Sequence, residues 1–409
     1  MAEERDLNRS IFSLLMSLFL LGTYSGFTQA QTQLTLSQTT IYDQNIFRNY
    51  LELPDWVNQT MIRLDRQFGF GSSRLRAEYT GDISFFQTYD DRRFHTHKAG
   101  IESFVPLSDN FLLNTGGEYG IRKNKSEYNY YDYAQWLIYS HLRIQKWQMT
   151  PIQFEFLVRT KDFKNLDEFS YRESLGSIQV KHFFPTKTTF IGQLTYASKK
   201  YLNDDTIEEF VIIEKDTLTI PGHGRGRGPK EPKIRADTSV VARNMSIPET
   251  RQWLLSLRIA QSIFDGTGIS LQYDRRFEPG QNTRYLQGQE YAYSKDDELY
   301  DDPYSYGSHE LQFVLTQILP WNSQLKMFAE FYDKDYTYTV DFGDQAETTS
   351  YRSDQQTILG LFVSKKIGIN RFTRGIEFYL STYYLSNQSN DPYFNFDNYS
   401  ANGGMEILF

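Results

Sequence analysis

The last eleven residues of the chain alternate strictly between two kinds of side chain. One set is apolar or small: Tyr399, Ala401, Gly403, Met405, Ile407 and Phe409. The other set is mostly polar: Ser400, Asn402, Gly404, Glu406 and Leu408. Successive side chains of a β-strand point to opposite faces. The sequence therefore predicts a terminal strand with one face toward an apolar medium and the other toward a polar one.

The same alternation recurs along the chain. In residues 152–159, Phe154 and Phe156 alternate with Gln153 and Glu155. Comparable patterns occupy residues 252–259, 310–316, 325–331 and 376–381. A β-sheet with lipid outside and water inside requires this pattern in every strand.

The connections between these segments alternate in length. The short ones contain Pro, Gly, Asn or Asp, as tight turns require: Pro106–Asn110, Trp147–Pro151, Pro185–Thr188, Phe264–Gly268, Pro320–Ser323 and Gly368–Thr373. The longer ones are polar: Tyr89–Arg93, Arg122–Tyr130, Lys161–Ser170, Tyr201–Thr250, Phe277–Ser308, Asp341–Asp354 and Asn387–Asn398. We therefore expect an all-β, antiparallel, up-and-down barrel of about 14 strands spanning residues 73–409. A soluble β-sandwich also alternates, but it seldom alternates loop length so regularly.

A terminal phenylalanine preceded by apolar residues at every second position resembles the assembly signal of bacterial outer-membrane β-barrel proteins. Here the signal comprises Tyr399, Met405, Ile407 and Phe409. Together with the alternating loops, it makes the chain similar to the porin-like barrels of Gram-negative bacteria. The resemblance implies a location in the cell outer membrane. Its implied partners are outer-membrane lipid, lipopolysaccharide and the barrel-assembly machinery.

The start of the sequence predicts an export signal over residues 1–30. Arg5 and Arg9 precede the apolar run Ile11–Leu21, and Thr28-Gln29-Ala30 supplies a small residue at the cleavage position. The mature chain is expected to begin near Gln31. The apolar run is shorter than the ~20 residues that span a bilayer as a helix.

Residues 31–72 precede the first clear strand and are expected to form a separate periplasmic segment. Asp55 follows Pro54 as a helix cap, and Val57, Met61 and Leu64 then fall at helical spacing with Phe68. A short plug inside the barrel mouth is one interpretation. A helix against the barrel rim, or a fraying first strand, is the other.

The composition excludes several classes of protein. With 39% hydrophobic and 23% charged residues, the chain is too polar for a helical membrane protein. Its aromatic share of 16% fits interfacial girdles of a transmembrane barrel. A net charge of −8 without a basic stripe argues against nucleic acid as a partner. With no cysteine, disulfides and thiolate metal sites are excluded.

The inward face of the predicted barrel carries seven basic and eight acidic side chains. They are Arg76, Glu78, Arg143, Glu155, Arg159, Glu173, Lys181, Arg258, Asp274, Arg276, Glu310, Lys326, Glu330, Glu377 and Glu406. Charges so nearly balanced could line an aqueous channel of weak ion selectivity. They could instead fill the lumen with ion pairs.

Two long loops carry distinctive sequences. Residues 201–250 contain a possible strand pair and the tract Gly222–Gly228, in which Arg225 and Arg227 could contact an anion such as lipopolysaccharide phosphate. The alternative is a mobile surface loop. Residues 277–308 are acidic and could bind Ca²⁺ through oxygen ligands, but their spacing matches no calcium-loop motif. A solvated acidic loop is the alternative.

No arrangement for catalysis is evident. His95 and His97 share a strand face near Asp90 and Asp91, and His141 lies on the inward face, yet no serine nucleophile can be placed beside any of them. The sequence predicts a non-enzyme without catalytic residues, cofactor or metal. Two functions stay open: a channel for small molecules, or a closed barrel that binds or assembles cell-surface partners through its loops.

Overall fold

The computed structural model describes residues 28–203, 205–214, 236–245, 249–277, 299, 301–340, 350–368 and 374–409. Its strands are β1 (Thr28–Asp43), β2 (Asp55–Phe70), β3 (Ser73–Phe86), β4 (Phe94–Ser108), β5 (Phe111–Asn124), β6 (Tyr133–Ile144), β7 (Ile152–Phe163), β8 (Tyr171–Phe183), β9 (Thr188–Tyr201), β10 (Asp205–Glu214), β11 (Ala236–Met245), β12 (Glu249–Phe264), β13 (Thr267–Phe277), β14 (Tyr306–Leu319), β15 (Ser323–Val340), β16 (Ser350–Ile367), β17 (Gly375–Ser389) and β18 (Phe396–Leu408). Among the described residues, short 3₁₀ helices lie in loops: η1 (Asp90–Arg92), η2 (Ser126–Tyr131), η3 (Asp167–Phe169) and η5 (Pro392–Phe394).

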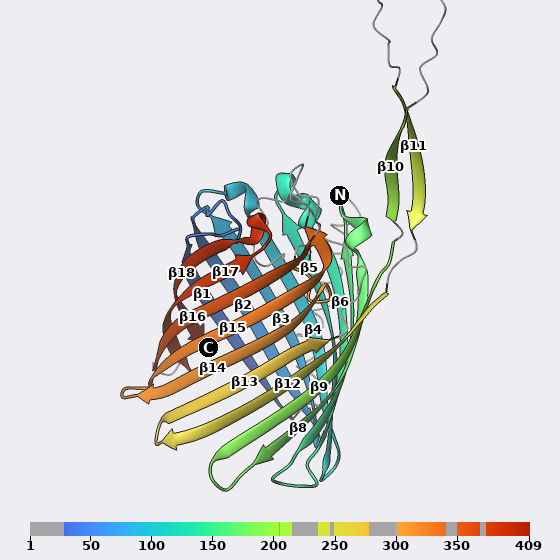
Figure 1. The fold of residues 1–409 in the computed structure, drawn as a ribbon. Helices are drawn as coiled ribbons and strands as arrows, with labels where there is room; N and C mark the ends of the chain where they lie inside the picture. The colour runs from blue at the N-terminus through green and yellow to red at the C-terminus, as the bar shows by residue number, and fades with distance from the viewer. Residues whose placement is uncertain are drawn as a thin grey trace, which may run out of the picture.

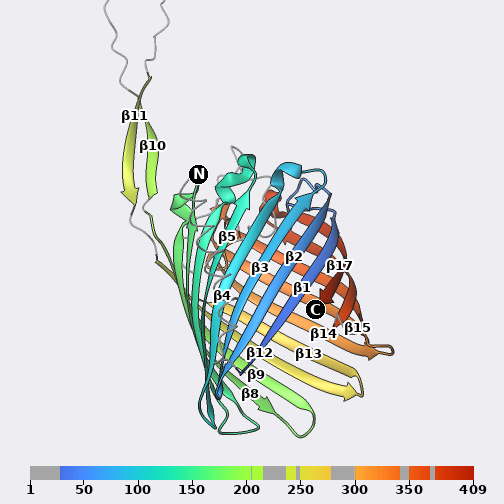
Figure 2. The ribbon, with the colours of Figure 1, turned by 180° about the vertical axis from the view of Figure 1, so that it is seen from behind.

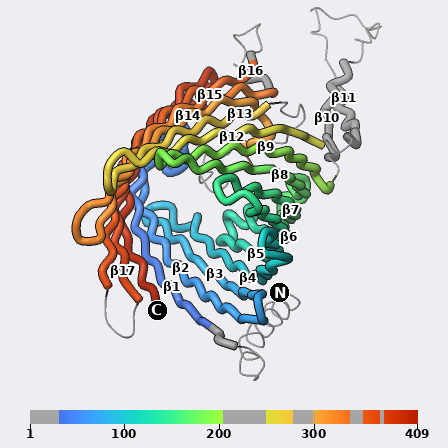
Figure 3. Tube along the Cα trace, turned by 90° about the horizontal axis from the view of Figure 1, so that it is seen from below, coloured from blue at the N-terminus to red at the C-terminus, as the bar shows by residue number. Residues whose placement is uncertain are grey.

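Sixteen strands form one closed antiparallel barrel, in which each strand pairs with its neighbour in the chain except across the insertion between β9 and β12 (Figure 1). The barrel closes where β1 pairs with β18, with Leu36 opposite Ile407. The backbone N–H of Phe409 donates to the carbonyl of Leu34 at 2.9 Å and extends this seam to the last residue. Seen from below, the strands run round one common axis (Figure 3).

The two ends of the barrel differ in their connections. Short turns gather at the lower end, and the longer loops with their small helices lie at the upper end (Figures 1 and 2). The turn between β2 and β3 contains Gly71 at φ +57°, a left-handed conformation that glycine adopts without strain. The predicted alternation of short turns and long loops is therefore confirmed. We refer below to the turn end and the loop end.

The number of strands differs from the prediction of about 14. The two additional strands are β1 and β2, so the segment 31–72 is part of the barrel wall and not a separate periplasmic segment or plug. β1 begins at Thr28, within the predicted export signal 1–30. The expected helix at residues 57–68 is wrong, because these residues pair with β1 on one side and β3 on the other. In a strand, Val57 and Met61 point inward whereas Leu64 points outward, so their helical spacing has no role.

Polar residues interrupt the apolar outer face of β1 and β2 in its loop-end part, whereas Leu36 and Ile62 continue that face nearer the turn end. Thr60 donates to Gln38 at 2.5 Å, and Thr40 donates to Asn58 at 2.8 Å, across the outside of this strand pair. These hydrogen bonds satisfy polar groups where other strands carry aliphatic ones. The backbone ladder, which depends little on side chains, then determines the strand.

Outward side chains elsewhere form an apolar surface bounded by aromatic residues. Near the loop end, cross-strand pairs of Tyr with Trp occur on β1–β2, β5–β6 and β9–β12. At the turn end, Phe264 and Trp321 are 72% and 83% exposed. From Trp253 to Phe264, β12 rises roughly 28 Å along the barrel axis, at ~3.3 Å per residue and a tilt of ~40°. This height matches an outward apolar band of about 25 Å.

Inward aromatic rings pack over glycines of neighbouring strands. A Cβ at Gly360 would lie 2.0 Å from the ring of Phe328, its cross-strand partner. At Gly116 the corresponding clash would be with Tyr139, at 2.6 Å. These glycines are required because the rings lie flat against the inner wall.

The insertion between β9 and β12 contains the strand pair β10–β11, which forms its own two-stranded sheet. A strand pair was expected within residues 208–220, and the structure instead pairs residues 205–214 with residues 236–245. The Gly222–Gly228 tract lies outside the described residues, as does the predicted export signal up to residue 27. Within the described part of the chain, no helix is long and apolar enough to span a membrane.

Candidate functional site

The strand pairing places the charged residues singled out in the sequence on one face of the barrel wall. Leu257 and Ile259 are exposed on the outside, and Arg258 between them therefore points inward. Following the cross-strand partners around the barrel puts the whole set on this inner face: Arg76, Glu78, Arg143, Glu155, Arg159, Glu173, Lys181, Arg258, Asp274, Arg276, Glu310, Lys326, Glu330, Glu377 and Glu406.

Some of these residues form ion pairs and others do not. On β2–β4, Arg76 contacts Asp65 at 2.5 Å, Glu78 at 2.9 Å and Glu102 at 3.5 Å. Asn114 also donates to Glu102 at 2.8 Å. Three carboxylates surround one guanidinium in this cluster. This part of the wall therefore carries a net negative charge.

A segment of the loop between β13 and β14 folds into the barrel at the loop end. Asp302 is 2% exposed and forms an ion pair with Lys199 of β9. Tyr201 donates to the same carboxylate at 3.3 Å. Leu299 joins a buried cluster that includes Tyr131 of η2 and Tyr171 of the inner wall. The segment therefore narrows the mouth of the barrel.

Tyr304 of the same segment reaches a second ion pair. Its hydroxyl donates to Glu173 at 2.7 Å, and Glu173 contacts Arg159 at 2.7 Å. Burial and the adjacent Glu173 carboxylate raise the pKa of the Tyr304 hydroxyl. Tyr304 is therefore a neutral donor at neutral pH and holds the segment to β8.

Asp301 connects the segment to β15. It contacts Lys334 at 2.5 Å and accepts a hydrogen bond from Tyr336. Burial alone would raise the pKa of the Asp301 carboxyl, but the positive charges of Lys334 and Arg352 outweigh it and lower the pKa. The carboxylate is therefore charged over the whole neutral range.

Arg352 of β16 is one of the most buried side chains at the loop end. It pairs with Asp354, and its guanidinium carbon lies 3.4 Å from the ring centroid of Phe394 and 4.1 Å from that of Tyr336. Cation–π contacts of this kind are stronger when they are desolvated. Arg352 therefore links the wall to the loop between β17 and β18.

The opposite part of the mouth is packed by the first loops. Ile46 and Phe47 lie in a buried cluster with Val57. Arg92 of η1 lies 4.4 Å from the ring of Tyr128 and 4.6 Å from that of Tyr131 in η2. Loop residues thus pack against the wall on this side of the loop end.

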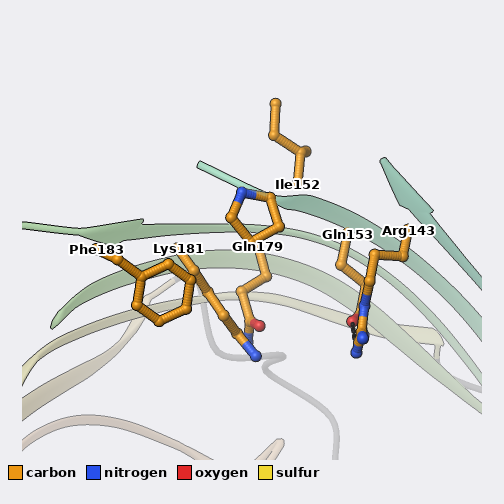
Figure 4. Close-up of a pocket in the computed structure, with 7 residues that line it drawn as sticks. Arg143, Ile152, Gln153, Gln179, Lys181 and Phe183 are labelled. Carbon is orange, nitrogen blue, oxygen red and sulfur yellow. Dashed lines mark hydrogen bonds between the residues drawn. The ribbon is translucent and has the colours of Figure 1, made fainter. Parts of the chain in front are cut away.

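The turn end of the lumen has a different chemistry. A cavity of about 140 Å³ is lined by Arg143, Gln153, Gln179 and Lys181. These four side chains point to one side of the sheet and Ile152 to the other (Figure 4). Arg143 donates to Gln153 at 3.4 Å, and Gln179 donates to Gln193 at 2.8 Å. In the described part of the chain, Arg143 and Lys181 have no ion pair, so they can bind the negative group of a solute.

Sequence reasoning missed the pairing of the acidic loop. Asp301 and Asp302 were expected in a solvated or calcium-binding loop, but they are ion-paired with Lys334 and Lys199. Both lysines occupy inward positions in the alternating pattern of their strands. This position was the only sequence signal that they could form ion pairs inside the barrel. No group of three potential metal ligands occurs among the described residues.

The histidines do not form a catalytic arrangement in the described residues. His95 and His97 share a face, as expected, but it is the outer one, where Nδ1 of His95 lies 3.0 Å from Nε2 of His97. Inside the barrel, Nε2 of His141 lies 3.3 Å from Glu155. Ser177 donates to Glu155 at 3.3 Å and not to His141, so it is not placed as a nucleophile activated by the imidazole.

Comparison with known proteins supports the fold. No protein-family model matches the sequence, and no curated protein matches it significantly. Among solved structures, Acinetobacter baumannii OccAB1 matches with a TM-score of 0.50 and 10% identity over 94% of this chain and 98% of that chain. Acinetobacter baumannii OccAB3 matches with a TM-score of 0.49 and 9% identity over 93% of this chain and 100% of that chain. The structure of Pseudomonas aeruginosa OccK2 in complex with glucuronate matches with a TM-score of 0.48 and 9% identity over 94% of this chain and 100% of that chain. At such identities the OccAB1 match indicates a shared fold and nothing finer.

Proposed function

Because the chain has the closed barrel fold of outer-membrane porins, we propose that it is a porin-like channel in the bacterial outer membrane that admits small molecules. The observation that carries this proposal is the barrel size combined with a polar inner wall. Barrels of about 8 strands are filled by side chains, whereas those of 16–18 strands leave an aqueous passage. This chain has 16 strands and a charged inner face.

The distribution of charge supports passage of polar, charge-bearing solutes. At the loop end, Lys199, Lys334 and Arg352 are ion-paired. At the turn end, Arg143 and Lys181 border a cavity with two glutamine amides. A small solute with a carboxylate or phosphate group would find charge-assisted hydrogen bonds there. As a membrane barrel, the protein would contact lipopolysaccharide and be inserted by the barrel-assembly machinery.

Single-channel recording with cysteine labelling tests the proposal. The chain has no cysteine, so a single introduced thiol reports its own environment. Ser256 points inward and its neighbour Leu255 points outward. In planar bilayers we expect stepwise conductance, and a bulky water-soluble thiol reagent should reduce it for Ser256→Cys.

The matched control is Leu255→Cys, which should be insensitive to the reagent because its thiol faces lipid. Absence of conductance across a range of voltages would contradict the channel function and favour a closed barrel that acts through its loops. Equal block of both variants would show that the reagent does not act from the lumen.

A further inference from the structure

Two basic side chains lie next to each other on the outside of the barrel near its loop end. Arg172 of β8 and Lys200 of β9 are direct cross-strand partners, and both are exposed. Neither has an ion pair among the described residues. Like charges placed directly opposite each other across a strand pair are destabilising. The inward neighbour Lys199, by contrast, is buried and paired with Asp302.

The two cations border a concave site. A cavity of about 360 Å³ is lined by Arg172, Lys200, Ser174, Ser198 and Glu249. Glu249 of β12 is the other cross-strand partner of Lys200, and its carboxylate forms an ion pair with Arg251 at 3.1 Å. The remaining charge is that of Arg172 and Lys200, beside two hydroxyl groups that can donate hydrogen bonds. This combination suits a phosphate group, which accepts several charge-assisted hydrogen bonds.

The site lies just above the outer aromatic boundary. Tyr196 and Trp253 pair on the outer face with ring centroids 4.9 Å apart. Ser198 is two residues and Lys200 four residues farther toward the loop end on β9, so Lys200 lies roughly 10 Å above Tyr196 along the axis. Aromatic belts mark the headgroup level of a membrane. The cations therefore lie where the phosphates of outer-leaflet lipids are found.

We propose that Arg172 and Lys200, with Ser174 and Ser198, bind the phosphate of an outer-leaflet lipid such as the glycolipid of lipopolysaccharide. The site rests on the proposed outer-membrane location but not on conduction, because it lies on the opposite face of the wall from the lumen. The guanidinium of Arg172 can form two parallel hydrogen bonds to phosphate oxygens. The bound anion removes the repulsion between the paired cations.

Binding of lipid A to the purified barrel in detergent micelles tests the site. Wild type should bind phosphorylated lipid A at least about tenfold more tightly than enzymatically dephosphorylated lipid A. The double variant Arg172→Gln with Lys200→Gln should lose this preference, and the charge-conserving pair Arg172→Lys with Lys200→Arg should keep most of it. Lys365→Gln is the matched control, because Lys365 is an exposed outward lysine near the turn end.

Equal affinity of wild type and the double glutamine variant would overturn the proposal. Full displacement of the lipid by equimolar inorganic phosphate would assign the site to a free anion and would also overturn it. Native-like circular dichroism of each variant establishes that it is folded. Conductance of the double variant should equal that of wild type, so failure of the lipid site and failure of the channel are distinguished.

Discussion

Residues 257 and 258 of β12 meet two different solvents. Leu257 is 37% exposed on the apolar outer surface near the middle of the membrane band, whereas Arg258 points into the lumen. Replacing Leu257 by Arg should cost about 2–4 kcal/mol of folding free energy, because it places a charge near the bilayer midplane. Arg258→Leu should change stability far less. Urea unfolding of both variants in lipid vesicles measures the difference, and the opposite ranking would mean that the two faces are exchanged.

The direction of single side chains is what the sequence predicts best. A period of two fixes which face a residue takes once the strand is located, so Arg258 and its counterparts were placed from the pattern alone. The partner of an inward residue is much harder to predict. Lys199 pairs with Asp302, which is 103 positions away, and only the folding of a loop into the barrel brings the two together.

At the scale of elements, the segment 301–305 should limit conduction. Asp302→Asn removes the charge that compensates buried Lys199, and loss of one partner of a buried ion pair commonly costs about 3–5 kcal/mol. The segment should then leave the inner wall, and single-channel conductance should increase. Asp333→Asn is the matched control, because Asp333 is exposed on the outer face of β15. Unchanged conductance in Asp302→Asn would show that the segment lies outside the path.

Acid should release the same segment. The pKa of Asp301 is lowered in the folded protein by Lys334 and Arg352, against the effect of burial. The contribution of Asp301 to stability is therefore fully present above the ordinary Asp pKa of about 3.9. It is lost as the pH falls through the lower pKa that Asp301 has in the folded protein. The conductance of the wild type should therefore not change with pH between roughly pH 5 and 8 and should rise below about pH 4. Recording wild type against Asp301→Asn tests this, and an identical acid response in both would contradict it.

Elements are predicted less well where an outer face is polar. β17 and β18 alternate clearly and were found from the sequence, whereas β1 and β2 carry Gln38, Asn58 and Thr60 toward the outside. These polar residues interrupt a period of two that the apolar outward residues of both strands otherwise follow, and the chance helical spacing of residues 57–68 then obscured it. Backbone hydrogen bonds to the neighbouring strands then determine the strand conformation, which the local sequence pattern alone does not indicate.

At the scale of the whole molecule, closure depends on the chain end. Phe409 donates from its backbone to Leu34 and ends the β1–β18 seam. Its deletion should lower the amount of barrel in the outer membrane more than removal of β10 and β11, which pair only with each other. Quantitative blots of outer-membrane fractions compare the two deletions. Normal accumulation without Phe409 would remove the role proposed for the terminal signal.

Ion selectivity is a property of the whole lumen, because the field in a narrow passage follows the local sum of fixed charges. The seven basic and eight acidic residues of the predicted inward set nearly cancel. The loop-end ion pairs of Lys199, Lys334 and Arg352 add no net charge, so the channel should discriminate only weakly between K⁺ and Cl⁻. Arg143 and Arg258 have no ion pair among the described residues, and their charge therefore acts on the passage directly. Replacing both by Gln should shift the reversal potential in a salt gradient toward cation preference.

The control for this shift removes the same charge from the outside, with Arg275→Gln and Lys365→Gln, since both residues are exposed on the outer face. These charges lie on the far side of the wall and do not line the passage, whose field follows the fixed charges along it, so this pair should leave the reversal potential unchanged. An equal shift in both double variants would mean that net charge alone sets selectivity. No shift in the lumen variant of a conducting barrel would place Arg143 and Arg258 outside the ion path.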